Sequence, residues 1–106
     1  MNIRAKNKRL EGILQLSILQ YLRVKGYQAG KTKTTGIKYG KIYHIDPYLF
    51  LGFPDITVFM PEIIFIEVKS PTGVLNPNQK LFQSYCKKAG IKYIVAKKME
   101  DVMDVV

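Results

Sequence analysis

The sequence predicts a single α/β domain, spanning residues 1–106, in which helices flank a mixed sheet. Three features favour this class. Residues 5–25 carry an apolar stripe at helical spacing. Residues 56–60 and 63–69 are two runs rich in β-branched and aromatic residues, as expected for paired strands. Asn76 then begins a segment with the signals of a capped helix.

The first predicted helix should bury one face. Its expected stripe is flanked by Ile18 and Leu22, and Gly26 should end the helix. The stripe consists of Leu10, Ile13, Leu14, Ser17, Tyr21 and Val24. Leu16 and Leu19 lie away from it, which would suit contact with a second copy of the helix. The alternatives are an ordinary exposed surface or a second contact within the chain.

The segment after this helix contains glycines and lysines without periodicity. We therefore predict a mobile basic loop over residues 30–40, followed by a short strand at 41–45.

The two central runs should form a hairpin across Pro61-Glu62. Side chains alternate across a strand, so parity separates the two faces of the hairpin. The even positions are all apolar and should be buried: Ile56, Val58, Met60, Ile64, Ile66 and Val68. The odd positions are apolar near the turn and ionisable at the open end, where they include Asp55, Glu67 and Lys69.

The second helix has a complete set of start signals. Asn76 is the expected N-cap, Pro77 suits the first helical position, and Gln79 can close a capping box. Its expected buried stripe is Phe82, Tyr85, Cys86 and Ala89. A strand at 92–96 and a closing helix at 99–106 complete the order helix, three strands, helix, strand, helix.

Charge and composition favour a polyanionic partner. The net charge is +9, and the whole excess lies in residues 1–45, because residues 46–106 are neutral. A basic segment of this kind suits phosphate binding, although a solubilising surface is the alternative. The single cysteine, Cys86, excludes an intramolecular disulfide and a multi-thiolate zinc site. The apolar runs are too short for a membrane span and no signal peptide is visible, so we expect a cytoplasmic protein without a membrane partner.

The ionisable end of the hairpin predicts a metal site. Cross-strand pairing should bring Asp55 level with Glu67 or Lys69, and two close carboxylates repel unless a cation lies between them. Oxygen ligands suit Mg²⁺ or Mn²⁺, and the Val68 carbonyl could add a ligand. Lys69 could then stabilise charge on a phosphate. The alternative is a solvated strand face, because a Glu and a Lys two residues apart are common there.

The motifs around these residues resemble the VRR-NUC (virus-type replication-repair) branch of the PD-(D/E)XK nucleases. They are Gly52-Phe53-Pro54-Asp55, then Phe65-Ile66-Glu67-Val68-Lys69-Ser70, Thr72-Gly73 and Asn76-Pro77-Asn78-Gln79. The resemblance covers nearly the whole chain except residues 30–40. It implies a restriction-endonuclease-like αβββαβ core and a Mg²⁺- or Mn²⁺-dependent endonuclease acting on branched or junction DNA, with a place in DNA repair in a bacterial or phage-infected cell. Stand-alone members of the family look like homodimers that resolve four-way (Holliday) junctions.

The resemblance also assigns supporting residues. It implies that Glu11 lies over the metal site as a further catalytic group, an additional ligand or an orienter of one, with Gln15 one turn further on; a surface salt bridge is the alternative for Glu11. Gln79 is either a capping residue only or also an active-site contact, and Ser70 either ends its strand or touches phosphate. The residues expected to contact DNA are Lys31, Lys33, Lys38 and Lys41, with base stacking considered for Tyr39, Tyr43 and Tyr48 and a phosphate contact or a structural role for His44.

Two other functions fit the same residues. One is a non-catalytic DNA-binding module that keeps the fold, against which the clustered carboxylates argue. The other is a nuclease of the same superfamily that cuts flaps or other DNA.

Overall fold

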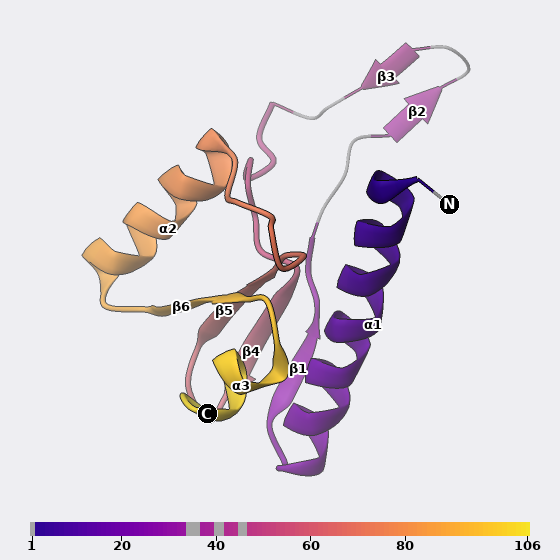
Figure 1. The fold of residues 1–106 in the computed structure, drawn as a ribbon. Helices are drawn as coiled ribbons and strands as arrows, with labels where there is room; N and C mark the ends of the chain where they lie inside the picture. Colours follow the sequence, from indigo (N-terminus) through magenta and orange to yellow (C-terminus); the bar gives the residue numbers. More distant parts are fainter. Residues whose placement is uncertain (1, 34–36, 40–41, 45–46) are drawn as a thin grey trace.

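The chain folds into a four-stranded mixed sheet with helices on both faces (Figure 1). The structure is a computed structural model that describes residues 2–33, 37–39, 42–44 and 47–106, with 37–39 and 42–44 as backbone only. Its elements are α1 (Ile3–Val24), β1 (Gln28–Lys31), β2 (Ile37–Tyr39), β3 (Ile42–His44), β4 (Ile56–Met60), β5 (Ile64–Val68), α2 (Pro77–Ala89), β6 (Lys92–Ala96) and α3 (Met99–Met103). The predicted fold class is confirmed.

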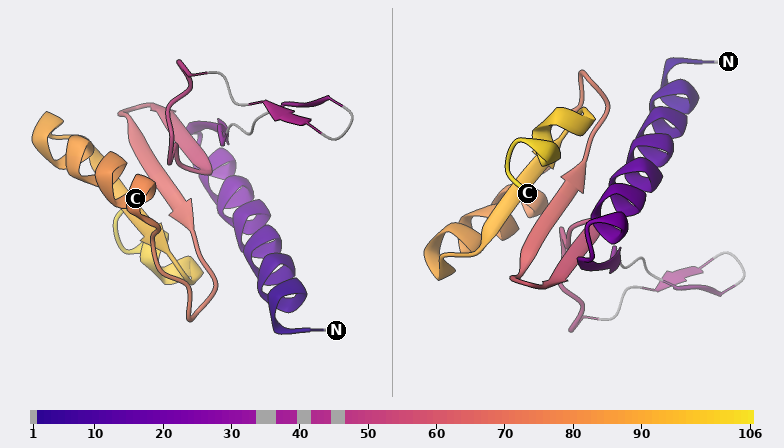
Figure 2. Two further views of the ribbon diagram at one scale, coloured as in Figure 1. Left: turned by 90° about the horizontal axis from the view of Figure 1, so that it is seen from above. Right: turned by 90° about the horizontal axis from the view of Figure 1, so that it is seen from below.

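The main sheet has the strand order β1-β4-β5-β6. The first two pairs are antiparallel, whereas β5 and β6 are parallel and are joined through α2. The helices α1 and α2 lie on opposite sides of this sheet, as the two views of Figure 2 show. A separate antiparallel pair, β2 and β3, projects away from the sheet (Figure 1).

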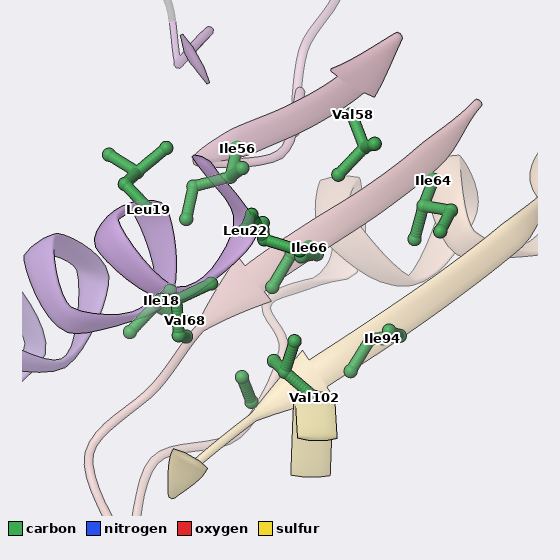
Figure 3. Packing of buried hydrophobic residues seen from close by; sticks show 11 residues of the cluster. Ile18, Leu19, Leu22, Ile56, Val58, Ile64, Ile66, Val68, Ile94 and Val102 are labelled. Carbon is green, nitrogen blue, oxygen red and sulfur yellow. The ribbon is translucent and has the colours of Figure 1, made fainter. Parts of the chain in front are cut away.

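One apolar core lies between the sheet, α1 and α3. Its members come from one face of the sheet and from the inward sides of these two helices (Figure 3). They are Ile18, Leu19, Leu22, Ile56, Val58, Ile64, Ile66, Val68, Ile94, Ala96 and Val102. Since full burial of a side chain of this size contributes roughly 1.5–3 kcal/mol, this cluster is the main apolar contribution to folding.

The hairpin formed by β4 and β5 sets the position of the site. Ile56 lies opposite Ile66, and Val58 opposite Ile64. Continued by one residue, this register places Asp55 level with Glu67, as predicted. The even-numbered residues face the core and are buried, except for Met60, which is exposed beside the turn. Met60 lies beyond Val58, the last residue of β4 that pairs with β5.

The opposite face of the sheet carries an aromatic cluster under α2. The ring centroids of Phe53 and Phe82 are 5.1 Å apart, and those of Phe65 and Phe82 are 5.2 Å apart, both edge to face. The cluster joins α2 to β5 and to the segment that leads into Asp55. It fixes the position of the second helix relative to the hairpin.

The buried residues of α1 differ from the predicted apolar stripe. The helix buries Ile18, Leu19 and Leu22, whereas Leu10, Ile13 and Val24 of the predicted stripe are exposed. Leu14 and Tyr21 pack partly against the core. The apolar pattern indicated the wrong buried residues because the inward face of the helix is polar in its first half, where it lines the candidate site. Leu19 therefore belongs to the core, and only Leu16 of the two leucines considered for an interface is exposed.

The two later helices also differ from prediction in detail. In α2 the capping box of Asn76 and Gln79 forms as predicted, and Cys86 is buried. Tyr85 and Ala89 are exposed, because α2 packs on β6 at the edge of the sheet and is covered on one narrow side. The closing helix ends at Met103, whose side chain is exposed, rather than continuing through residue 106.

The predicted loop over residues 30–40 was wrong at both ends. Its first two residues belong to β1, and residues 37–39 form β2. The sequence of β1, Gln-Ala-Gly-Lys, has little intrinsic strand preference, so its conformation comes from pairing with β4. The short strand predicted at 41–45 is present as β3 over Ile42–His44.

Candidate active site

Asp55 is held at the open end of the hairpin by backbone contacts. Its Oδ2 accepts a hydrogen bond of 2.8 Å from the backbone N–H of Val68. Its own carbonyl accepts one of 2.9 Å from the N–H of Thr32, which follows β1. The Thr32 hydroxyl lies 3.3 Å from the Pro54 carbonyl and 2.7 Å from the hydroxyl of Thr57. Asp55 is thereby fixed from both neighbouring strands.

Glu67 is a fully buried carboxylate, with 0% of its surface exposed. Its Oε1 accepts a hydrogen bond of 2.7 Å from Nε2 of Gln79. Its Oε2 is buried without a hydrogen-bond partner in the described part of the chain. Burial raises the pKa of Glu67 from 4.5 to about 7, and the nearby Asp55 adds to the rise. An unpaired oxygen on a buried acid is costly, so this atom is suited to a ligand.

Two lysines partly offset the charge of this pair. Nζ of Lys33 lies 3.6 Å from Oδ1 of Asp55 and 3.7 Å from Oε1 of Glu67. Nζ of Lys69 lies 3.7 Å from the same oxygen of Glu67. Both lysines favour the charged carboxylate and lower the pKa of Glu67, but burial outweighs them. Lys69 was predicted here, whereas Lys33 was expected only as a DNA contact.

The first half of α1 forms the other wall of the site. Together with the hairpin end it encloses a pocket of about 370 Å³. The pocket is lined by Lys8, Glu11, Gly12, Gln15, Lys33, Asp55, Glu67, Val68 and Lys69. The structure thus places Glu11 and Gln15 beside Asp55 and Glu67. No hydrogen bond or ion pair joins either of these α1 residues to another described side chain.

Gly52 connects the site to the start of α2. Its φ of +73° is in the left-handed region, and a Cβ there would lie 2.4 Å from the backbone carbonyl of Asn78. The chain leading to Asp55 therefore packs directly on the first turn of α2. That same turn carries Gln79, whose Oε1 closes the capping box while its Nε2 reaches Glu67. Gln79 thus has both of the roles that the sequence left open.

The remaining predicted contacts include residues whose side chains are described and residues whose side chains are not. Lys31 is exposed at the end of β1, and Ser70 is buried just after β5, and neither lines the pocket. Lys41 lies outside the described residues, as do the side chains of Lys38, Tyr39, Tyr43 and His44. Tyr48 is exposed and lines a separate apolar groove of about 310 Å³ with Phe50 and Phe53.

The donors of the site suit a hard cation. Asp55 and Glu67 present carboxylate oxygens, and the unpaired Oε2 of Glu67 is available to a ligand. No cluster of three or more acidic, histidine or cysteine residues exists among the residues described. A cation held by Asp55 and Glu67 alone would have two acidic ligands and keep several waters, a coordination that Mg²⁺ accepts.

Comparison with known proteins agrees with this architecture. Residues 48–99 match the sequence model of the VRR-NUC domain. This chain carries a VRR-NUC domain. A solved structure described as a VRR_NUC domain superposes with a TM-score of 0.65 at 22% identity, covering 91% of this chain and 92% of that one. No curated protein matches the sequence significantly.

The matched segment contains the centre of the site but only part of its walls. Asp55, Glu67, Lys69 and Gln79 lie within residues 48–99, whereas Glu11, Gln15 and Lys33 lie before it. The three-dimensional match covers 91% of the chain and therefore extends well beyond this segment. The domain is of a nuclease type. Within the described residues, no helix is long and apolar enough to cross a membrane.

Proposed function

We propose that this VRR-NUC domain is a divalent-metal-dependent endonuclease that hydrolyses phosphodiester bonds in branched DNA, with four-way junctions as its substrate. The observation that carries the proposal is the buried carboxylate of Glu67 beside Asp55, in a pocket of about 370 Å³ that is also lined by lysines. A protein that only binds DNA gains nothing from two acidic groups facing phosphate. Because these carboxylates repel the phosphate backbone of DNA, their presence favours a catalytic role.

The metal proposed for this site is Mg²⁺ or Mn²⁺. Asp55 and Glu67 would hold it, with the Val68 carbonyl as a further candidate ligand and Glu11 across the pocket as an additional or water-mediated one. When bound, the ion would supply an activated water and neutralise charge on the phosphate. The all-oxygen donor set and the unpaired Oε2 of Glu67 support this assignment.

The protein groups have separable tasks in this proposal. Gln79 fixes the orientation of Glu67 through its hydrogen bond to Oε1. Lys69, whose ammonium lies 3.7 Å from Glu67, stabilises the negative charge that develops on the phosphoryl oxygens. Lys8 on α1 faces the same pocket and attracts the DNA backbone. Gln15, one turn beyond Glu11, contacts the bound strand.

Symmetric cutting of a four-way junction requires two such sites. A twofold homodimer supplies them at a fixed spacing. The exposed apolar residues Ile13 and Leu16 on α1 are suited to that contact, since neither belongs to the core. Leu19, which we had also expected there, is buried and is excluded from the proposed interface.

The proposal is tested with a panel of four-way, flap, splayed and duplex DNA, each incubated with Mn²⁺ and with Mn²⁺ plus EDTA. We expect cleavage of the junction that EDTA stops and that Glu67→Gln reduces at least about a hundredfold. Binding of junction DNA by that variant should be unchanged or tighter, because a carboxylate facing phosphate is removed. Light scattering on the same wild-type sample should give twice the mass of one chain.

Three results would count against this assignment. Wild-type cutting by Glu67→Gln would remove the catalytic role of the acidic pair. Faster cleavage of flap DNA than of the four-way junction would show that the substrate is the asymmetric flap and not the junction. A monomer that still makes both cuts in a junction would overturn the dimer.

A further inference from the structure

We infer that Lys33 is an internal counter-cation of the metal site, which holds Asp55 and Glu67 together in the metal-free protein and is displaced when a divalent ion binds. The inference rests on the proposed metal-dependent function. It assigns to Lys33 a task at the carboxylates themselves rather than a fixed contact to DNA.

The position of its ammonium is the first reason. Nζ of Lys33 is within 3.7 Å of one oxygen of each carboxylate, and it is the one lysine among the described residues that reaches both. Lys69 contacts Glu67 alone. Two close carboxylates need a shared positive charge, and without a metal Lys33 supplies it. The ammonium therefore occupies the place that is electrostatically best for a cation.

The ease of displacement is the second reason. The side chain of Lys33 is 47% exposed, compared with 15% for that of Lys69. Its contacts of 3.6 and 3.7 Å are longer than the 2.7–2.9 Å or so of a charge-assisted hydrogen bond, so charge attraction holds it rather than directional bonding. A divalent ion that bound the same oxygens directly would repel the ammonium. Lys33 must then move toward solvent.

The backbone next to Lys33 limits how far it can go. The preceding residue, Thr32, donates its N–H to the carbonyl of Asp55, and its hydroxyl bonds to Thr57. The side chain can therefore pivot while its base stays fixed at the rim of the pocket. An ammonium released there is placed to meet a DNA phosphate. Metal binding would in this way prepare a phosphate contact beside the site.

Lys31 provides a matched control. It is the last residue of β1, two positions before Lys33, is exposed, and makes no ion pair with any residue in the described ranges. Lys31→Met and Lys33→Met lower the net charge by the same amount. A difference in Mn²⁺ affinity between them therefore reports on the position of Lys33 at the carboxylates.

The test measures Mn²⁺ binding without DNA, from the electron paramagnetic resonance signal of free Mn²⁺, together with melting temperatures in EDTA and in Mn²⁺. We expect Lys33→Met to bind Mn²⁺ on the order of tenfold more tightly than Lys31→Met, since two half-exposed ion pairs no longer compete. In EDTA, Lys33→Met should melt at a lower temperature than Lys31→Met. Added Mn²⁺ should raise its melting temperature by more.

Lys33→Arg and Glu67→Gln complete the set. Arginine keeps the positive charge. The Mn²⁺ affinity of Lys33→Arg should therefore differ less from the wild-type value than the affinity of Lys33→Met does. Should Lys33→Met be unfolded in EDTA, recovery of its melting transition in Mn²⁺ supports the inference, and failure to recover overturns it.

The outcomes separate the inference from the function on which it rests. Equal Mn²⁺ affinities for Lys33→Met and Lys31→Met, or weaker binding by Lys33→Met, would overturn the displacement of Lys33 while leaving the metal site intact. Absence of Mn²⁺ binding in the wild type and in every variant would remove the metal site itself. Binding that persists in Glu67→Gln at the wild-type affinity would place the ion elsewhere and overturn both.

Discussion

The two halves of α1 present opposite chemistry on one continuous face. In the second half Ile18 and Leu22 are fully buried against the sheet. In the first half the same face continues at Glu11 and Gln15, at helical spacings of three and four residues, and lines the pocket over Asp55. The helix is thus a packing element at one end and a wall of the site at the other.

The β4–β5 hairpin also changes from apolar to polar along its length. Near its centre the β4–β5 hairpin presents apolar side chains to Ile18 and Leu22. At the open end of the same hairpin it presents Asp55 and Glu67. The core therefore positions the acidic pair rigidly, and the pocket begins where apolar cover ends. Substitutions in the two halves should separate stability from activity.

The largest expected effect compares Leu22→Ala with Gln15→Ala. Leu22 is fully buried, so its truncation should cost about 2–5 kcal/mol of unfolding free energy. The side chain of Gln15 makes no hydrogen bond to a described residue, so Gln15→Ala should change stability by less than about 0.5 kcal/mol but reduce DNA cleavage. Urea unfolding and a nicking assay measure the two quantities. Equal destabilisation by both variants would show that the polar half also serves packing.

A smaller effect is expected from two glycines that border the site. Gly52→Ala would force a side chain at positive φ against the backbone of α2, and should cost upward of about 1 kcal/mol. Gly12→Ala, in the middle of α1, meets nothing within 4 Å and should stabilise the protein by about 0.5–1 kcal/mol. Thermal unfolding of both variants measures this difference. A destabilising Gly12→Ala would mean that the pocket is narrower than it is in the structure.

The site was more predictable from sequence than the faces of the helices. Strand parity and the short turn were enough to bring Asp55 level with Glu67, because pairing in a hairpin is local. The capping signals of Asn76 and Gln79 are local as well, and they placed the start of α2 correctly. Local rules do not show which face of a helix packs against the sheet. Exposed Val24 was therefore assigned to the core, and buried Leu19 was not.

Two features depend on contacts that sequence patterns do not show. The first is β1, whose four residues become a strand only through pairing with β4. Because residues 30–40 were predicted to form a loop, Lys33 was not expected at the acidic pair. The second is the inward face of α1. Apolar periodicity does not detect this face, because its residues become polar where they line the site. The isolated acid Glu11 was the available signal for that change.

The last expected effect is a pH dependence that distinguishes the site end from the core end. Without metal, the pKa of Glu67 is raised from 4.5 to about 7, so between these values the folded protein holds a proton that the unfolded chain has released. Its stabilising contribution is complete below pH 4.5 and is lost as pH rises through 7. The change should be at most a few kcal/mol, since each pKa unit corresponds to about 1.4 kcal/mol.

This dependence is measured as the difference in unfolding free energy between the wild type and Glu67→Gln, in EDTA, from pH 4.5 to pH 8. The variant cannot titrate at residue 67, so the wild type should lose stability relative to it as pH rises. Leu22→Ala, which alters the core alone, should stay parallel to the wild type across the range. Parallel curves for Glu67→Gln and the wild type would show that Glu67 titrates in the folded protein as it does in the unfolded chain. In that case the attraction of Lys33 and Lys69 would balance the burial of Glu67 and the repulsion from Asp55.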